Sequence, residues 1–232
     1  MGDFAIAPPP LLQRAADRIA PASLDVVVSP GVDPVPNLAL EDAFLAEVDA
    51  GTRGDTLRLW VSGACLVRGP NRSRRNGWHR PEVAQSLGVP IYERSSGGGT
   101  VYHDTGNLNW SFFLRRAAGY FGAAGLFRAC AGLIVDALRP LGIAAAFAAP
   151  NRIDVAGRKV SGIAARASLE AVLVHGTLLV SSDLERINAL CIYPPGCPAV
   201  QNLAAFAPGL TVGDVIGAIA LRARAFAAVS SA

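Results

Sequence analysis

Apolar and polar positions alternate with a period of two in several short runs of the chain. The clearest run is 107–114, where Asn107, Asn109 and Ser111 alternate with apolar residues. Such alternation is typical of a β-strand with one buried face, so we predict an apolar side toward the core and a polar side able to line a site. Further strands are predicted at 24–28, 57–61, 64–67, 143–148 and 171–180, with a hairpin around Ala156 and Gly157.

Other segments repeat their apolar residues at helical spacing. In 37–51, Asn37 suits the N-cap and Gly51 suits the end of a helix. Further helices are predicted at 81–87, at 120–141, from Asp183, and at 211–228 with Thr211 as its cap. Strand pairs separated by helices predict an α+β fold, in which a mixed or antiparallel sheet is flanked by helices.

The predicted elements form one domain over residues 25–232, because no internal repeat or long linker interrupts them. Residues 1–24 are rich in Ala and Pro and are expected to form a poorly ordered tail. No stretch reaches the roughly 18 apolar residues of a membrane span, and the first residues lack the basic head and apolar segment of a signal peptide. We therefore expect a cytoplasmic protein without membrane contact.

Charge and cysteine content exclude some classes of function. The net charge of +3 is too small to indicate nucleic-acid binding, and the arginine-rich segment 72–75 is expected to be a solvated loop, with a phosphate ligand as the alternative. The four cysteines form no CxxC pair, which disfavours zinc. Cys65 and Cys130 lie in apolar runs and are expected in the core. Cys191 and Cys197 flank a predicted loop, as ordinary loop residues or as reactive thiols.

The densest group of candidate functional residues lies in 94–109, with sequence RSSGGGTVYHDTGNLN. The three glycines at 97–99 can adopt φ > 0 and direct their amides at an anion, and Arg94 can add a bidentate donor. This is not a Walker loop, since no Gly-Lys-Ser/Thr follows, and not a dinucleotide fingerprint, since a β-run follows instead of a helix. A flexible hairpin loop is the alternative.

Lys159 is the single lysine of the chain, and even its neighbour Arg158 is an arginine. Lysine carries a compact and mobile charge, whereas arginine presents a rigid planar fork. A lysine kept in a chain that otherwise uses arginine suggests that the ammonium itself is needed at this hairpin. A chance survivor of biased composition is the alternative.

Three blocks of the sequence, at 94–109, 151–164 and 175–179, resemble the lipoate-protein ligase family, a branch of the biotin and lipoate ligase superfamily. The resemblance extends from about residue 35 to 205 and implies a catalytic domain of the biotin/lipoate ligase fold. It also implies a two-step reaction. Lipoate or octanoate is first activated by ATP and Mg²⁺ to the acyl-AMP, and the acyl group then passes to a lysine of an acceptor lipoyl domain of the E2 or H-protein type.

The resemblance implies that Lys159 is the catalytic lysine. Arg94 and the glycines would hold the acyl and phosphate end, Asn151 would contact the phosphate or metal region, and His103 would brace the loop. Leu108, Trp110 and Phe112 are either acyl-chain lining or plain core. The substrate- and nucleotide-binding positions implied are Arg94, Ser96, Gly97, Gly98, Gly99, His103, Asn107, Asn151, Ser161, Gly162, Ala164, His175, Gly176 and Thr177.

The chain departs from the family pattern in two places. Arg152 stands where the family usually has an aspartate, so Asp154 is the possible Mg²⁺ ligand. The familiar ligases also carry a C-terminal accessory domain, whereas this sequence stops soon after its last predicted helix, so a separate accessory subunit is a possible partner. Two other functions stay open: acyl transfer from a carrier protein through a cysteine such as Cys191, and non-catalytic binding of lipoylated domains or lipoyl-AMP.

Overall fold

The computed structural model describes residues 24–70, 78–116 and 122–230. The predicted tail up to residue 23 and the arginine-rich segment 72–75 lie outside the described residues. Leu24, where the predicted tail meets the predicted strand 24–28, is buried and belongs to the main hydrophobic core.

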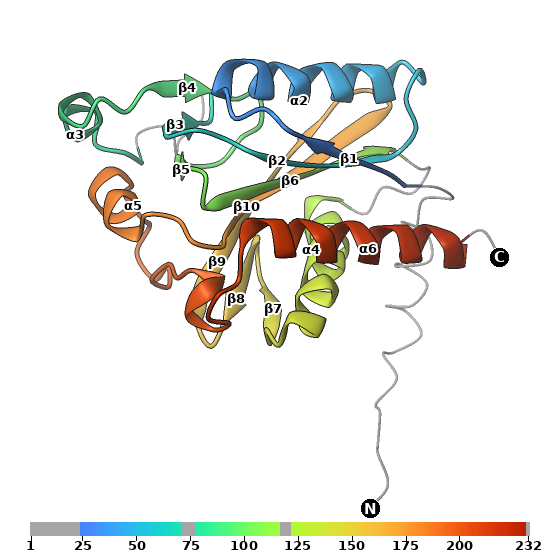
Figure 1. Ribbon diagram of the computed structural model, residues 1–232. Helices are drawn as coiled ribbons and strands as arrows, with labels where there is room; N and C mark the ends of the chain where they lie inside the picture. Colours follow the sequence, from blue (N-terminus) through green and yellow to red (C-terminus); the bar gives the residue numbers. More distant parts are fainter. Residues whose placement is uncertain (1–23, 71–77, 117–121, 231–232) are drawn as a thin grey trace, which may run out of the picture.

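A seven-stranded sheet forms the centre of the fold (Figure 1). β1 and β2 are parallel and all other neighbours are antiparallel, which confirms the predicted mixed sheet. In spatial order, its strands are β1 (Asp25–Ser29), β2 (Thr56–Val61), β6 (Asn107–Arg115), β10 (Ala171–Leu179), β9 (Arg158–Ala167), β8 (Arg152–Val155) and β7 (Ala145–Ala148).

A second sheet of three short strands lies beside the first, in the order β4 (Ile91–Glu93), β3 (Cys65–Arg68) and β5 (Val101–His103). The segment at Ser62 and Gly63 therefore carries the chain from one sheet to the other. β4 and β5 were not predicted from the sequence, because three residues are too few to show an alternating pattern.

Helices cover both faces of the large sheet (Figure 1). α2 (Pro34–Asp49) packs on one face against β6 and β10, while α4 (Gly122–Leu138) and α6 (Val212–Ser230) pack on the other. The shorter helices are α3 (Pro81–Ser86), α5 (Leu184–Leu190) and the 3₁₀ turns η1 (Arg139–Leu141) and η2 (Leu203–Ala205).

α2 begins earlier than its sequence predicts. Asp33 is the N-cap, because its carboxylate accepts a hydrogen bond from the Val35 amide at 2.9 Å, and Pro34 suits the first helical position. Asn37, the predicted cap, is buried inside the helix, and its amide donates to the carbonyls of Gly31 and Val61. The predicted cap was wrong because Asn37 serves a tertiary contact.

Several local predictions are confirmed. Ala156 and Gly157 both have positive φ, 48° and 73°, and close the β8–β9 hairpin. Asp183 caps α5 by accepting from the Arg186 amide, and Thr211 accepts from the Asp214 amide at the start of α6.

The strand β6 is buried on both faces, whereas the alternation in 107–114 is typical of a strand with only one buried face. Leu108, Trp110 and Phe112 pack into the core with α4 and α6. Asn109 and Ser111 point to the opposite face, where α2 and the small sheet cover them. Its polar side is therefore shielded from bulk water.

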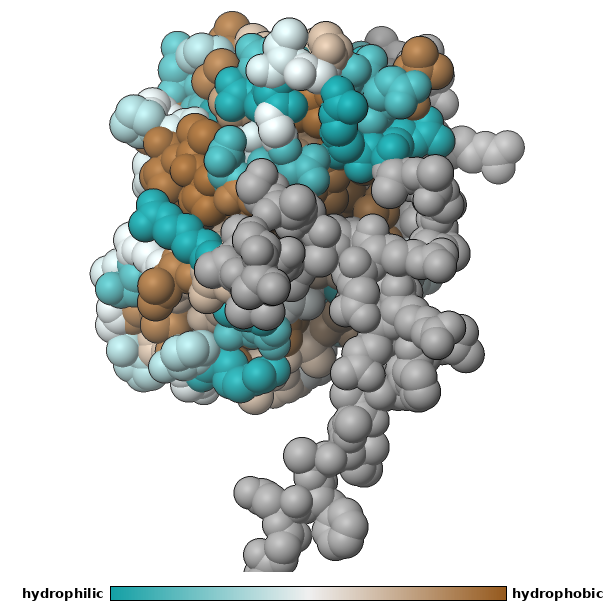
Figure 2. Space-filling model, turned by 90° about the vertical axis from the view of Figure 1, so that its right-hand side faces the viewer, coloured by the Kyte–Doolittle hydropathy of each residue, from teal (hydrophilic) through white to brown (hydrophobic). Residues whose placement is uncertain are grey.

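On the face shown in Figure 2, hydrophilic and hydrophobic residues lie side by side on the surface. Within the described residues, no helix combines the length and apolar character required to cross a membrane.

Candidate active site

A cavity of about 360 Å³ opens on the α2 side of the large sheet. The strand register builds its floor from neighbouring rows of side chains that share one face. Trp60, Asn109 and Thr177 form one row across β2, β6 and β10. Ser111 and His175 belong to the next row. Polar groups from strands far apart in the sequence therefore face the same space.

Most of the predicted site residues line this cavity. Those that do are Arg94, Gly98, Gly99, His103, Asn151, Lys159, Ser161, Gly162, Ala164, His175, Gly176 and Thr177. Three of the predicted substrate- and nucleotide-binding residues do not. Ser96 is buried behind the wall, Gly97 is exposed, and Asn107 is fully buried with its amide donating to the Asn109 side chain at 3.2 Å. These three therefore contribute to the surroundings of the cavity instead of its surface.

Lys159 lies at the start of β9, where its backbone is fixed on both sides. Its amide donates to the Ala199 carbonyl and its carbonyl accepts from the Gln201 amide, both at 3.0 Å. The ammonium Nζ lies 5.9 Å from the centre of the Tyr193 ring. No carboxylate pairs with it in the part of the chain that the structure describes. A rigid backbone thus presents an ammonium without a counter-ion to the cavity.

The glycine-rich segment packs against β9 and Trp78. Gly98 has a φ of 105°, which side chains rarely tolerate, and a Cβ added there would lie 3.0 Å from Arg94 Nη2. A Cβ on Gly99 would meet the Trp78 ring at 2.7 Å. Glycine is therefore required at Gly98 for its backbone conformation and at Gly99 for the close approach to Trp78, and both residues line the same cavity as Lys159.

Arg94 binds the glycine-rich segment itself. Its guanidinium donates to the carbonyls of Val67 at 3.0 Å, Gly97 at 2.9 Å and Gly99 at 2.7 Å. These contacts occupy both N–H groups of Nη2, so the predicted bidentate contact to a ligand anion is not available in this arrangement. Burial lowers the pKa of Arg94 to about 10, which leaves the side chain charged near neutral pH.

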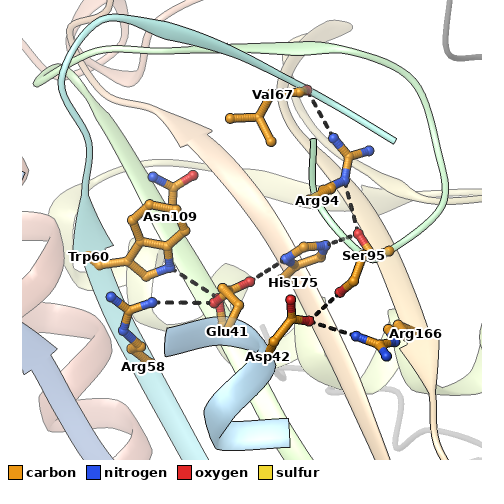
Figure 3. A network of polar contacts seen from close by, with 12 residues as sticks. Glu41, Asp42, Arg58, Trp60, Val67, Arg94, Ser95, Asn109, Arg166 and His175 are labelled. Atoms are coloured by element: carbon orange, nitrogen blue, oxygen red, sulfur yellow. Dashed lines mark hydrogen bonds and ion pairs between the residues drawn. The ribbon is translucent and has the colours of Figure 1, made fainter. Parts of the chain in front are cut away.

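A network of charged and polar groups continues from Arg94 beneath the cavity (Figure 3). Ser96 lies 2.6 Å from His175 Nε2, and His175 Nδ1 lies 2.7 Å from the Glu41 carboxylate. Glu41 in turn forms an ion pair with Arg58 at 3.6 Å. Burial raises the pKa of Glu41, but the hydrogen bond from His175 leads the opposing contributions, so the net shift is downward and the carboxylate is ionised.

His103 lines the cavity as a neutral imidazole. Burial, together with the charge of Arg94, lowers its pKa to about 3. Its ring meets Trp60 edge to face at 5.6 Å, and its Nδ1 has no hydrogen-bond partner among the described residues. The same holds for Asn109 Nδ2 and Ser161 Oγ. Buried polar atoms without partners are costly, which indicates that the cavity accommodates water or a polar ligand group.

Asn151 and Asp154 are both engaged within the protein. The Asn151 amide donates to the Ile163 carbonyl at 2.7 Å and thereby fastens the start of β8 to β9. The Asp154 carboxylate accepts from Arg152 Nε at 2.9 and 3.0 Å, and Asp154 does not line the cavity. This geometry does not fit the predicted Mg²⁺ role of Asp154. No group of three or more potential metal-binding side chains occurs within residues 24–70, 78–116 and 122–230.

The sequence did not indicate several residues of the cavity wall, namely Glu41, Trp60, Trp78 and the segment 192–196 between the two candidate thiols. The alternation in 57–61 did indicate Trp60, because Arg58 and Trp60 lie on the opposite face of the strand from the core residues Leu57 and Leu59. The segment 192–196 has no such pattern. It is held at the cavity by backbone contacts of Cys191 and Ile192 with residues 78–80 and by the pairing of the following residues with Lys159.

The predicted acyl-chain residues Leu108, Trp110 and Phe112 do not line the cavity, and they belong to the core on the other face of the sheet. Cys65 and Cys130 are buried as predicted. Cys191 does line the cavity, but burial raises the pKa of its thiol to about 11, which opposes formation of a thiolate.

Solved structures of lipoate ligases share this fold. One is the bi-partite lipoate protein ligase of Thermoplasma acidophilum, described with its E2 lipoyl domain (TM-score 0.71, 21% identity, covering 88% of this chain and 82% of that chain). Another is a lipoate-protein ligase A bound with ATP (TM-score 0.72, 20% identity, 88% and 84%). These similarities show that the chain has the fold of these lipoate ligases.

The chain belongs to the lipoyl protein ligase A/B catalytic domain family, which it matches over residues 33–222. Among curated relatives, lipoate-protein ligase 1 of Staphylococcus aureus is 32% identical over 163 residues, which are 70% of this chain and 48% of that protein. The chain spans about half the length of the curated relatives it matches.

Proposed function

We propose that this chain activates lipoate or octanoate with ATP, forms the acyl-AMP, and transfers the acyl group to a lysine of an acceptor lipoyl domain. The observation that carries the proposal is the position of Lys159, whose ammonium lines the same cavity as Gly98 and Gly99. An ammonium there can neutralise a carboxylate and a phosphate brought close together, and can stabilise the charge that develops during transfer.

The composition of the cavity supports an acid with a hydrocarbon chain as substrate. The lining combines polar side chains such as Lys159 and Asn151 with apolar ones such as Trp60, Val67, Trp78 and Leu179. A carboxylate near Lys159 and a hydrocarbon chain against the tryptophans would satisfy both kinds of side chain. The volume of the cavity also falls within the usual range for small-molecule sites.

The proposed cosubstrate is ATP, accompanied by Mg²⁺, whose protein ligands are left unassigned because Asp154 is bonded to Arg152. The proposed acceptor is a lipoyl domain of the E2 or H-protein type, with a separate accessory subunit as a further partner in the cytoplasm. The bi-partite archaeal ligase supports the idea of two cooperating chains.

Acyl transfer through a cysteine is less well supported. Cys191 is buried with a raised thiol pKa, and the run 144–146 contains only alanine. Non-catalytic binding of lipoyl-AMP is the second candidate, favoured by Arg152, which occupies the position of the family aspartate and lines the cavity.

The test is to incubate the purified chain with lipoate, octanoate or biotin, ATP, Mg²⁺ and an acceptor domain, and to measure the intact mass of the acceptor. A lipoyl or octanoyl mass increase that requires ATP is expected. An increase without ATP, from an octanoyl carrier protein, would indicate transfer through a thiol. Saturable binding of lipoyl-AMP without any mass increase or pyrophosphate release would indicate the non-catalytic function.

A further inference from the structure

Beneath the cavity lies a buried ion pair that the proposed reaction does not use. Arg58 is 0% exposed and Glu41 is 4% exposed. Arg58 also donates to the Ser29 hydroxyl at 2.8 Å and to the Asn37 carbonyl at 2.9 Å, so it is firmly held. Buried ion pairs often contribute no more stability than apolar residues of the same size. The pair therefore needs an explanation other than stability.

The hydrogen bonds that lead away from Glu41 have one consistent direction. An ionised carboxylate only accepts, so His175 Nδ1 must carry a hydrogen and donate it to Glu41. In a neutral imidazole with a hydrogen on Nδ1, Nε2 is an acceptor, and the Ser96 hydroxyl donates to it. The Ser96 oxygen can then accept from Arg94 Nε, which lies 2.9 Å away.

The last member of this chain of hydrogen bonds holds the glycine-rich segment. Arg94 donates to the Gly97 and Gly99 carbonyls. In a trans peptide the carbonyl and the following amide point in opposite directions, so Arg94 turns the amides of Gly98 and Thr100 away from itself. The orientation of these peptides thus depends on the position of Arg94, which depends on Ser96 and His175.

We propose that Glu41 is a positioning residue, which fixes His175 in the form with a hydrogen on Nδ1 and, through Ser96 and Arg94, sets the orientation of the glycine-rich segment. The inference rests on the proposed function for its catalytic consequence alone. Glu41 lies on α2 and Arg94 follows β4, so this device connects the helix above the sheet to the wall of the cavity. If Glu41 acted only as the counter-ion of Arg58, the position of the hydrogen on the His175 ring would not depend on Glu41.

The direct test uses long-range ¹H–¹⁵N correlation spectra of the free protein, which distinguish the two neutral forms of histidine. The chain has three histidines, so the His175 signals can be assigned by their loss in His175→Gln. The wild-type protein should carry the hydrogen on Nδ1 of His175, and Glu41→Ala should lose that preference. A hydrogen on Nε2 in the wild-type protein would overturn the proposal without any variant.

Two further variants separate positioning from charge compensation. Glu41→Gln keeps an accepting oxygen and should retain the Nδ1 hydrogen. The double variant of Glu41→Ala with Arg58→Met leaves no unpaired buried charge and should still lose it. If the double variant folds and His175 remains unchanged, Glu41 is a counter-ion only and the proposal is overturned. Glu47→Ala, which removes an exposed glutamate of the same helix paired with Arg53, is the control and should change nothing.

The catalytic consequence is measured separately, as kcat and KM for acyl-AMP formation. Glu41→Ala should lower kcat/KM by about 100-fold, since small misplacements in a catalytic site have effects of this order. Glu41→Gln should restore most of the activity. Absence of acyl-AMP formation by the wild-type protein would refute the proposed function, whereas the spectra of His175 would still decide the positioning role.

Discussion

At the scale of single residues, Lys159 is the residue on which the proposed formation of acyl-AMP depends most. Its backbone is fixed by hydrogen bonds to the Ala199 and Gln201 backbones, and its ammonium has no carboxylate partner in the described part of the chain. The side chain therefore contributes little to the core, and its removal should leave the fold intact.

Lys159→Ala should abolish acyl-AMP formation, measured as exchange between ATP and pyrophosphate, without lowering the unfolding temperature. Lys159→Arg should fail as well, because a planar fork cannot replace a compact ammonium in the space beside Gly162. Arg158→Ala, at the exposed neighbouring position, is the control and should keep normal exchange. Normal exchange in Lys159→Ala would show that the assigned role is wrong.

Cys191 allows a second test at this scale. Burial raises the pKa of its thiol to about 11, so few molecules carry a thiolate at neutral pH. Cys191→Ser should therefore retain ATP-dependent acylation of the acceptor within a few-fold, measured by intact mass. Complete loss of activity in a folded Cys191→Ser protein would favour the thiol route instead.

His103 predicts how acid affects stability. Its pKa is about 3 in the folded protein against 6.5 ordinarily, so between these values the unfolded chain binds a proton that the folded chain does not. Within this window the free energy of unfolding should decrease as the pH decreases, by up to about 1.4 kcal/mol per pH unit from His103. In urea unfolding between pH 7 and pH 5, His103→Gln should lose less stability than the wild-type protein. Equal losses would contradict a buried neutral His103.

At the scale of elements, the close contact between β9, β10 and β6 shapes the floor of the cavity. A Cβ on Gly176 would lie 2.5 Å from the Trp110 ring and 2.7 Å from the Gly162 carbonyl oxygen, and neither group has room to move. Glycine is therefore required where these strands meet.

Gly176→Ala should lower the free energy of unfolding by about 1–3 kcal/mol, the usual cost of overpacking, as measured by urea denaturation. Gly217→Ala is the matched control, since Gly217 is exposed in α6 and an added Cβ meets nothing within 4 Å. It should raise stability by up to about 1 kcal/mol through helix propensity. Equal effects of the two substitutions would argue against the packing described for β10.

Periodicity predicted most elements because it reports which side of a helix or strand is buried. It placed the strands around Asn109 and His175 and the hairpin at Gly157 close to where they lie. It could not reveal β4 and β5, which are too short, or the true start of α2, where Asn37 was diverted from capping to a contact with Val61.

At the scale of the whole molecule, the site arises where segments distant in sequence meet. Arg94, Lys159 and His175 could be predicted because each lies in a sequence block that resembles the lipoate-protein ligase family. Glu41 and Arg58 could not, since their significance depends on which helix covers which face of the sheet. The hydrogen bonds from Arg94 to the Gly97 and Gly99 carbonyls likewise could not be predicted, because these partners are visible only in three dimensions.

The most direct test of the central claim is a crystal structure of the chain with a non-hydrolysable analogue of lipoyl-AMP. The account predicts that the phosphate substitute lies within hydrogen-bonding distance of Lys159 Nζ and beside the backbone of Gly98 and Gly99, with the hydrocarbon chain in the same cavity. An analogue bound elsewhere, or bound in this cavity with Lys159 directed away from it, would contradict the account.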